Sequence, residues 1–147
     1  MTGRPARAAW ATAAVLVSGL FLTGCTADAT SLVRDFLAAD RQPDDTLPAD
    51  MGTPGMDGDS SRLAGSLDGT SYYLAEYVQP ETGTPVICLI LISTGTEFGN
   101  SACGPAEQLR TVGSMTGGAT IVEREDPVPD GWTRLGDFLI VNPDARP

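Results

Sequence analysis

The chain has 147 residues, the length of a single domain, and a formal net charge of −10. It contains neither histidine nor lysine, which excludes Ser-His-Asp and Cys-His nucleophile arrangements and removes the usual ligand of zinc and copper sites. The excess of acidic residues disfavours a nucleic-acid partner, because phosphate binding needs a basic surface. We therefore expect a protein that is not an enzyme and that binds neither a metal ion nor an organic cofactor.

The first 24 residues have the layout of an export signal. Arg4 and Arg7 supply positive charge, and residues 8–22 carry no charge at all. A membrane span that stays in place needs about 20 strongly apolar residues. This run is shorter and rich in Ala, Thr, Ser and Gly. We therefore predict that residues 1–24 form a signal peptide that is cleaved.

Four residues close this apolar run, and together they resemble the lipobox of bacterial lipoproteins. Leu22 is aliphatic, Thr23 and Gly24 are small, and Cys25 follows. The resemblance implies a diacylglyceryl group on the Cys25 sulfur, fatty acids such as palmitate, cleavage before Cys25, and a place on the outer face of the cytoplasmic membrane. Two acyl chains suffice for stable attachment, at about 0.8 kcal/mol per buried methylene.

Cleavage would leave seven arginines against nineteen acidic residues, a formal net charge of −12. Anionic headgroups repel such a domain, so the lipid is expected to supply its attachment to the membrane. The heavy use of Ala, Gly, Arg and Asp is typical of GC-rich organisms such as actinobacteria. Residues 130–137 also look similar to the ends of small uncharacterised actinobacterial lipoproteins, a resemblance that brings no activity with it.

Residues 25–59 are expected to form the lipidated N-terminus, a short helix and a flexible acidic tether. Leu32, Val33, Phe36 and Leu37 fall on one face of a helix capped by residue 30 or 31. That face packs either on the domain or on the membrane, and its acidic neighbours favour the domain. Residues 41–59 contain five Asp, three Pro and three Gly, which predicts a disordered coil spanning roughly 25 Å.

Residues 60–147 show strand and turn signals, which predict a mainly β domain. We expect six or seven short strands in a small antiparallel sheet folded as a sandwich or partial barrel, with the strand order left open. Asp68 and Gly69 suit a tight hairpin. Residues 86–92 are apolar at every position, as in a strand covered on both faces. Strands are expected at residues 62–67, 70–78, 85–93, 98–103, 119–124 and 138–142, with a helical turn at 105–108 and residues 109–115 ambiguous.

Two cysteines remain once Cys25 is assigned to lipid. In an exported domain such a pair favours a disulfide. Folding the chain about residues 94–97 carries Cys88 opposite Cys103, and cross-strand neighbours lie about 4.5 to 5.5 Å apart at Cα, within disulfide range. The separation of fifteen positions favours a structural bridge over a redox motif.

Two functions follow from these features. The leading one is a membrane-anchored, non-catalytic binding or interaction module of the cell envelope, with an envelope protein as its partner. Tyr72, Tyr77 and Trp132 are candidates for its binding surface, although tyrosines on a half-buried strand more often pack in a core. The alternative is a carboxylate-dependent hydrolase acting on cell-wall glycan. Its candidate residues, chosen by type because spacing selects no pair, are Glu76, Glu81, Glu97, Glu107, Glu123, Glu125 and Asp137.

Overall fold

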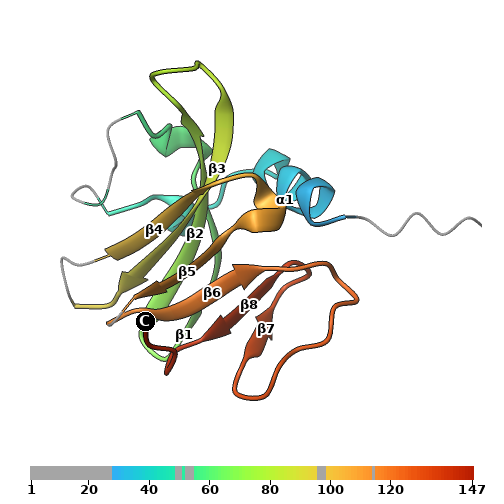
Figure 1. The fold of residues 1–147 in the computed structure, drawn as a ribbon. Coiled ribbons are helices and arrows are strands. Elements are labelled where there is room, and N and C mark those ends of the chain that lie inside the picture. Colours follow the sequence, from blue (N-terminus) through green and yellow to red (C-terminus); the bar gives the residue numbers. More distant parts are fainter. Residues whose placement is uncertain (1–27, 49–50, 52–54, 96–98, 114) are drawn as a thin grey trace, which may run out of the picture.

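The computed structural model describes residues 28–48, 51, 55–95, 99–113 and 115–147. This part of the chain is mainly β, with two four-stranded antiparallel sheets and one α-helix (Figure 1). The predicted signal peptide, the lipobox with Cys25, and Glu97 lie outside the described residues. Within the described ranges, no helix is long and apolar enough to cross a membrane.

The first sheet has the strand order β1-β2-β3-β4, in which each strand pairs with the next one along the chain. Asp68 and Gly69 form the two-residue turn between β1 and β2, with positive φ angles of 47° and 78°. Both residues tolerate this left-handed conformation, which confirms the predicted hairpin. The strands are β1 (Arg62–Leu67), β2 (Thr70–Val78), β3 (Pro85–Ser93) and β4 (Gly99–Gly104).

The second sheet has the strand order β5-β6-β8-β7. It brings the strands to eight rather than six or seven, because the ambiguous residues 110–113 form a strand and the three residues 133–135 form another. The predicted helical turn is confirmed as η4 (Ala106–Gln108), which joins the two sheets. The strands are β5 (Arg110–Gly113), β6 (Gly117–Ile121), β7 (Thr133–Leu135) and β8 (Leu139–Asn142).

The main core lies between the two sheets and is closed at one end by helix α1 (Ala29–Ala38). Leu32, Val33 and Leu37 are buried in it, and the rings of Phe36 and Phe138 lie 5.0 Å apart. The helix therefore packs on the domain, as expected from its acidic neighbours. The other buried side chains of this core come from both sheets and from η4: Tyr72, Leu74, Leu89, Leu91, Ala106, Leu109, Ala119, Ile121, Leu139 and Val141.

The N-terminus of α1 is capped by Asp28 rather than by Thr30 or Ser31. The Asp28 carboxylate accepts a hydrogen bond from the Ser31 backbone N–H at 2.8 Å. This bond stabilises the charged carboxylate and holds the pKa of Asp28 below its ordinary value of 3.8, with a smaller contribution from Arg34. An Asp at this position satisfies a backbone N–H that has no partner within the helix.

A second apolar cluster covers the outer face of the first sheet. Leu47, Met51 and Met56 pack there, and they come from the segment expected to be a tether. The flexible coil expected over residues 41–59 is therefore not what the structure shows for the described part of this segment. Its contacts also explain why residues 86–92 of β3 are apolar at every position, since both faces of the strand are covered. On the sheet side the cluster consists of Tyr73, Ala75, Cys88, Ile90 and Ile92.

The described residues of 41–59, here called the covering segment, are held to β1 by the buried carboxylate of Asp45. This carboxylate accepts hydrogen bonds from the backbone N–H groups of Leu63 at 2.7 Å and Gln42 at 2.6 Å. The Arg62 guanidinium lies 3.9 Å away, so the buried charge also has an opposite charge beside it. Only 5% of Asp45 is exposed, so these bonds are shielded from water. This Asp-rich segment can therefore be ordered, because the Asp45 carboxylate accepts hydrogen bonds from two backbone N–H groups.

We expect Asp45→Ala to lower the free energy of unfolding by about 2 kcal/mol, because two backbone N–H groups lose a charged acceptor. Urea unfolding followed by circular dichroism measures this change. Asp44→Ala is the matched control, because the Asp44 side chain is exposed and should contribute little to stability. Equal stabilities for the two variants would contradict the role assigned to Asp45.

The predicted disulfide is present between Cys88 of β3 and Cys103 of β4. The two residues are direct cross-strand partners, and their Cα atoms lie 4.0 Å apart. Cys88 is fully buried under the covering segment, whereas Cys103 lies exposed on the edge strand. The bridge ties that edge strand to the centre of the sheet, as expected for a structural disulfide.

Candidate functional site

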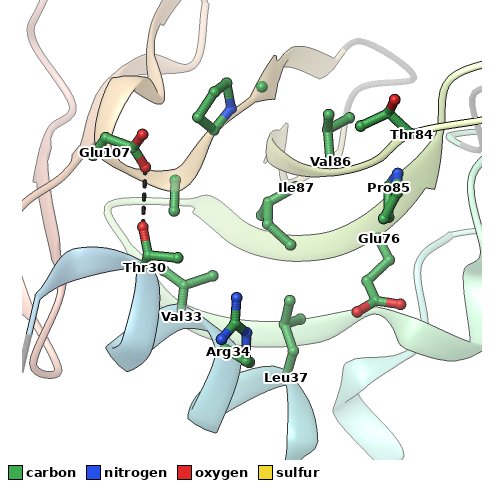
Figure 2. A pocket seen from close by; sticks show the side chains of 13 residues that line it. Thr30, Val33, Arg34, Leu37, Glu76, Thr84, Pro85, Val86, Ile87 and Glu107 are labelled. Carbon is green, nitrogen blue, oxygen red and sulfur yellow. Dashed lines mark hydrogen bonds between the residues drawn. The ribbon is translucent and has the colours of Figure 1, made fainter. Parts of the chain in front are cut away.

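A groove of about 460 Å³ lies between α1, the start of β3 and the η4 turn. Figure 2 shows the side chains of α1 along one wall and those of β3 and η4 along the other. The groove is lined mostly by apolar groups, and three charged residues stand among them. The apolar lining consists of Val33, Leu37, Pro85, Val86, Ile87, Pro105 and Ala106, and the charged residues are Arg34, Glu76 and Glu107.

The helical wall of the groove follows from the spacing of residues in α1. Val33 and Leu37 lie four positions apart and so share one face, and Thr30 and Arg34 repeat that spacing one row away. The apolar pair extends from the core into the floor of the groove, while Arg34 is exposed above it. The same amphipathic pattern that packs the helix on the domain therefore also builds this wall.

The opposite wall exists because β4 does not extend alongside the first two residues of β3. Ile87 pairs with Gly104, the last residue of β4, and Pro105 then leads the chain away into η4. The Gln79 N–H donates to the Thr84 carbonyl at 3.0 Å, so this carbonyl points toward the β2 side of β3. Backbone groups alternate sides along a strand, so the Pro85 carbonyl points away from β2, toward the edge of β3 that β4 leaves open. Proline suits this open edge because it has no N–H that needs a partner.

The charged groups of the groove are spread along its length. The Glu107 carboxylate accepts a hydrogen bond from the Thr30 hydroxyl at 3.0 Å. Arg34 and the carboxylate of Glu76 make no hydrogen bond or ion pair with any described residue. In Figure 2 the two glutamates stand at opposite ends of the groove, with Arg34 between them. The groove thus presents an apolar floor and a negative, positive, negative order of charges.

A second hollow of about 390 Å³ lies where α1 meets β7 and Phe138. Three charged residues line it, and two of them, Arg124 and Asp137, already form an ion pair at 2.7 Å, while the third is the exposed Asp35 of α1. Its wall also contains Phe36, whose ring contacts that of Phe138. Because its Arg and nearest acid satisfy one another, this hollow offers a ligand less than the groove does.

The structure does not bring Tyr72, Tyr77 and Trp132 together as a binding surface. Tyr72 is fully buried between the sheets, and this burial raises the pKa of its hydroxyl. Tyr77 packs on the opposite face of the same sheet, because five positions along a strand reverse the side. Trp132 is half-buried beside Gly118 of the second sheet. The three side chains therefore do not share one surface, and both tyrosines pack in apolar clusters.

Two of the candidate carboxylates, Glu76 and Glu107, line the same groove. Asp137 belongs to the ion pair with Arg124, and Glu81 lies in an exposed turn. The described residues contain no group of three or more His, Cys, Asp or Glu side chains placed to hold a metal ion. The remaining described candidates, Glu123 and Glu125, lie exposed outside the groove.

No motif in the sequence marks Arg34 or Pro85 as a site residue. The i, i+4 repeat in the helix was visible, but its meeting with β3 depends on the tertiary fold. Comparison with models of known protein families, with curated proteins and with solved structures found no match.

Proposed function

We propose that this chain is a membrane-anchored surface lipoprotein and a non-catalytic binding module of the cell envelope, whose ligand occupies the groove between α1 and β3. The observation that carries the proposal is the groove itself: an open apolar floor with Arg34 and Glu76 left unpaired among the described residues. Ligand sites combine an apolar lining with a few polar groups in this way.

The position of the proposed anchor sets where this groove works. Cys25 precedes Asp28, the capping residue of α1, by three residues. Three residues span at most about 10 Å, so lipid on Cys25 would hold the domain near the membrane instead of lifting it by roughly 25 Å. Thr30, at one end of the groove, is five residues from Cys25. The ligand would accordingly be met close to the outer face of the membrane.

Site-specific photocrosslinking in intact cells tests the groove. A photoreactive amino acid at Thr84, which lines the groove, should give a defined adduct, whereas the same group at the nearby exposed Thr82 should not. Gly104→Phe should abolish the adduct. Gly104 lines the groove, and a Cβ there meets only the end of Leu109 at 3.9 Å, so the first carbon of a larger side chain is accommodated without a clash.

Two results would overturn the binding function. One is the same adduct pattern from both positions, and the other is an adduct from Thr84 that persists in Gly104→Phe. Thermal unfolding of each variant verifies that the fold is retained, so that a missing adduct reports on the groove.

The alternative function, hydrolysis of cell-wall glycan, is favoured only by the presence of Glu76 and Glu107 in one groove. A hydrolase of this kind needs one carboxyl group as acid and a second as base or nucleophile. Release of soluble sugar from purified cell-wall glycan should then be lost in both Glu76→Gln and Glu107→Gln. Activity that is unchanged in these variants, or absent from the unaltered protein, would eliminate the hydrolase.

A further inference from the structure

We infer that the groove takes an extended peptide segment of an envelope protein, with aliphatic side chains on the apolar floor and basic side chains at both ends. This inference rests on the proposed function and specifies its ligand.

The charges of the groove complement a basic segment. Glu76 and Glu107 stand at the two ends, and Arg34 lies between them (Figure 2). Lys or Arg side chains of a ligand would therefore meet a carboxylate at each end, while Arg34 would find acceptors in the carbonyl groups of the peptide backbone. The net charge of −12 for residues 25–147 attracts a basic partner from a distance as well.

The floor and the strand edge suit an extended backbone. The largely buried Val33 and Leu37 and the half-buried Ile87 form a branched aliphatic floor, which suits aliphatic side chains of a ligand. The Pro85 carbonyl at the open edge of β3 can accept a hydrogen bond from an N–H of an adjacent extended chain. Proline offers no N–H in return, so the edge provides one bond where a full strand addition would use several. Most of the affinity would then come from the side chains.

A lipid or other amphiphile with an anionic headgroup fits these charges less well. Its head would reach Arg34 only between two carboxylates, which repel a negative charge. The proximity of the membrane makes such a ligand accessible, so the experiment includes it as a competing outcome.

Peptide binding to the lipidated protein in phosphatidylcholine nanodiscs tests the inference. The probe is a fluorescein-labelled octapeptide of alternating Lys and Val, and its anisotropy is compared with that of a Glu and Val peptide. The Lys peptide should bind and the Glu peptide should not. Glu76→Gln and Glu107→Gln should each raise Kd about threefold, the effect of removing one exposed ion pair. Glu81→Gln, which is exposed and outside the groove, should leave Kd unchanged.

The outcomes separate the ligand class from the proposed function. Equal binding of both peptides would overturn the inference that the ligand is a basic peptide. So would a Kd that is unchanged in both Glu76→Gln and Glu107→Gln. Saturable binding of dodecyl phosphate that Gly104→Phe abolishes would overturn it in favour of an amphiphile. In either case an adduct from Thr84 that Gly104→Phe removes would leave the binding function standing. A Thr84 adduct that persists in Gly104→Phe would overturn both the basic peptide and the binding function.

Discussion

Replacing Cys25 with alanine should move the protein from the membrane fraction to the soluble fraction. The proposed diacylglyceryl group needs the Cys25 sulfur, and two acyl chains supply binding at about 0.8 kcal/mol per buried methylene. No other attraction of comparable strength is expected, because a domain with a net charge of −12 is repelled by anionic headgroups. Fractionation of cells followed by immunoblotting measures the effect, and mass spectrometry of the N-terminal peptide verifies the lipid.

The double variant Cys88→Ala/Cys103→Ala is the control for this experiment. It removes two cysteines but leaves Cys25, so it should remain with the membrane. Cys25→Ala should in turn keep the disulfide and the stability of the unaltered domain. Membrane association that persists in Cys25→Ala would refute the anchor.

Removing the disulfide should lower the free energy of unfolding by about 3 kcal/mol, the loss expected in the chain-entropy model for a loop of this length. The two cysteines are 15 positions apart, and the bridge joins the edge strand β4 to β3. Urea unfolding of Cys88→Ala/Cys103→Ala measures the loss. Alanine is preferred to serine at residue 88 because that side chain is fully buried and a hydroxyl there would add an unsatisfied polar group.

Reduction of the unaltered protein provides a check that involves no substitution. Dithiothreitol should produce a similar loss of stability, and it should have no further effect on the double variant. A double variant as stable as the unaltered protein would show that the bridge is not a main support of the fold.

The mainly β class, the strand positions around the disulfide and the two-residue hairpin at Asp68 and Gly69 were predictable because their causes are local. Alternation, turn residues and hairpin register depend on neighbours a few positions away. Counting from residues 94–97 was enough to place Cys88 opposite Cys103. The strand β7 was missed because three residues carry too little periodicity to be recognised.

The covering segment shows where sequence reasoning failed. Residues 41–59 have the composition of a solvated coil, and their few apolar residues gave no sign of a partner. The partner is the outer face of β2 and β3, which becomes available only after those strands have paired. Asp45 then accepts a hydrogen bond from the backbone N–H of Leu63 in β1, eighteen residues away, a contact that composition cannot reveal.

The groove was beyond prediction for the same reason, since Arg34 and Pro85 share a site only when helix and sheet meet. What the sequence by itself determined was the β class, the disulfide register and the amphipathic face of α1, all of which follow from spacing along the chain. Only the tertiary structure decided that Tyr72 is core, that Asp45 fastens the covering segment and that Glu76 faces the same groove as Glu107. Those contacts join residues far apart in the sequence, and they exist only because apolar surfaces on separate elements must be buried against one another.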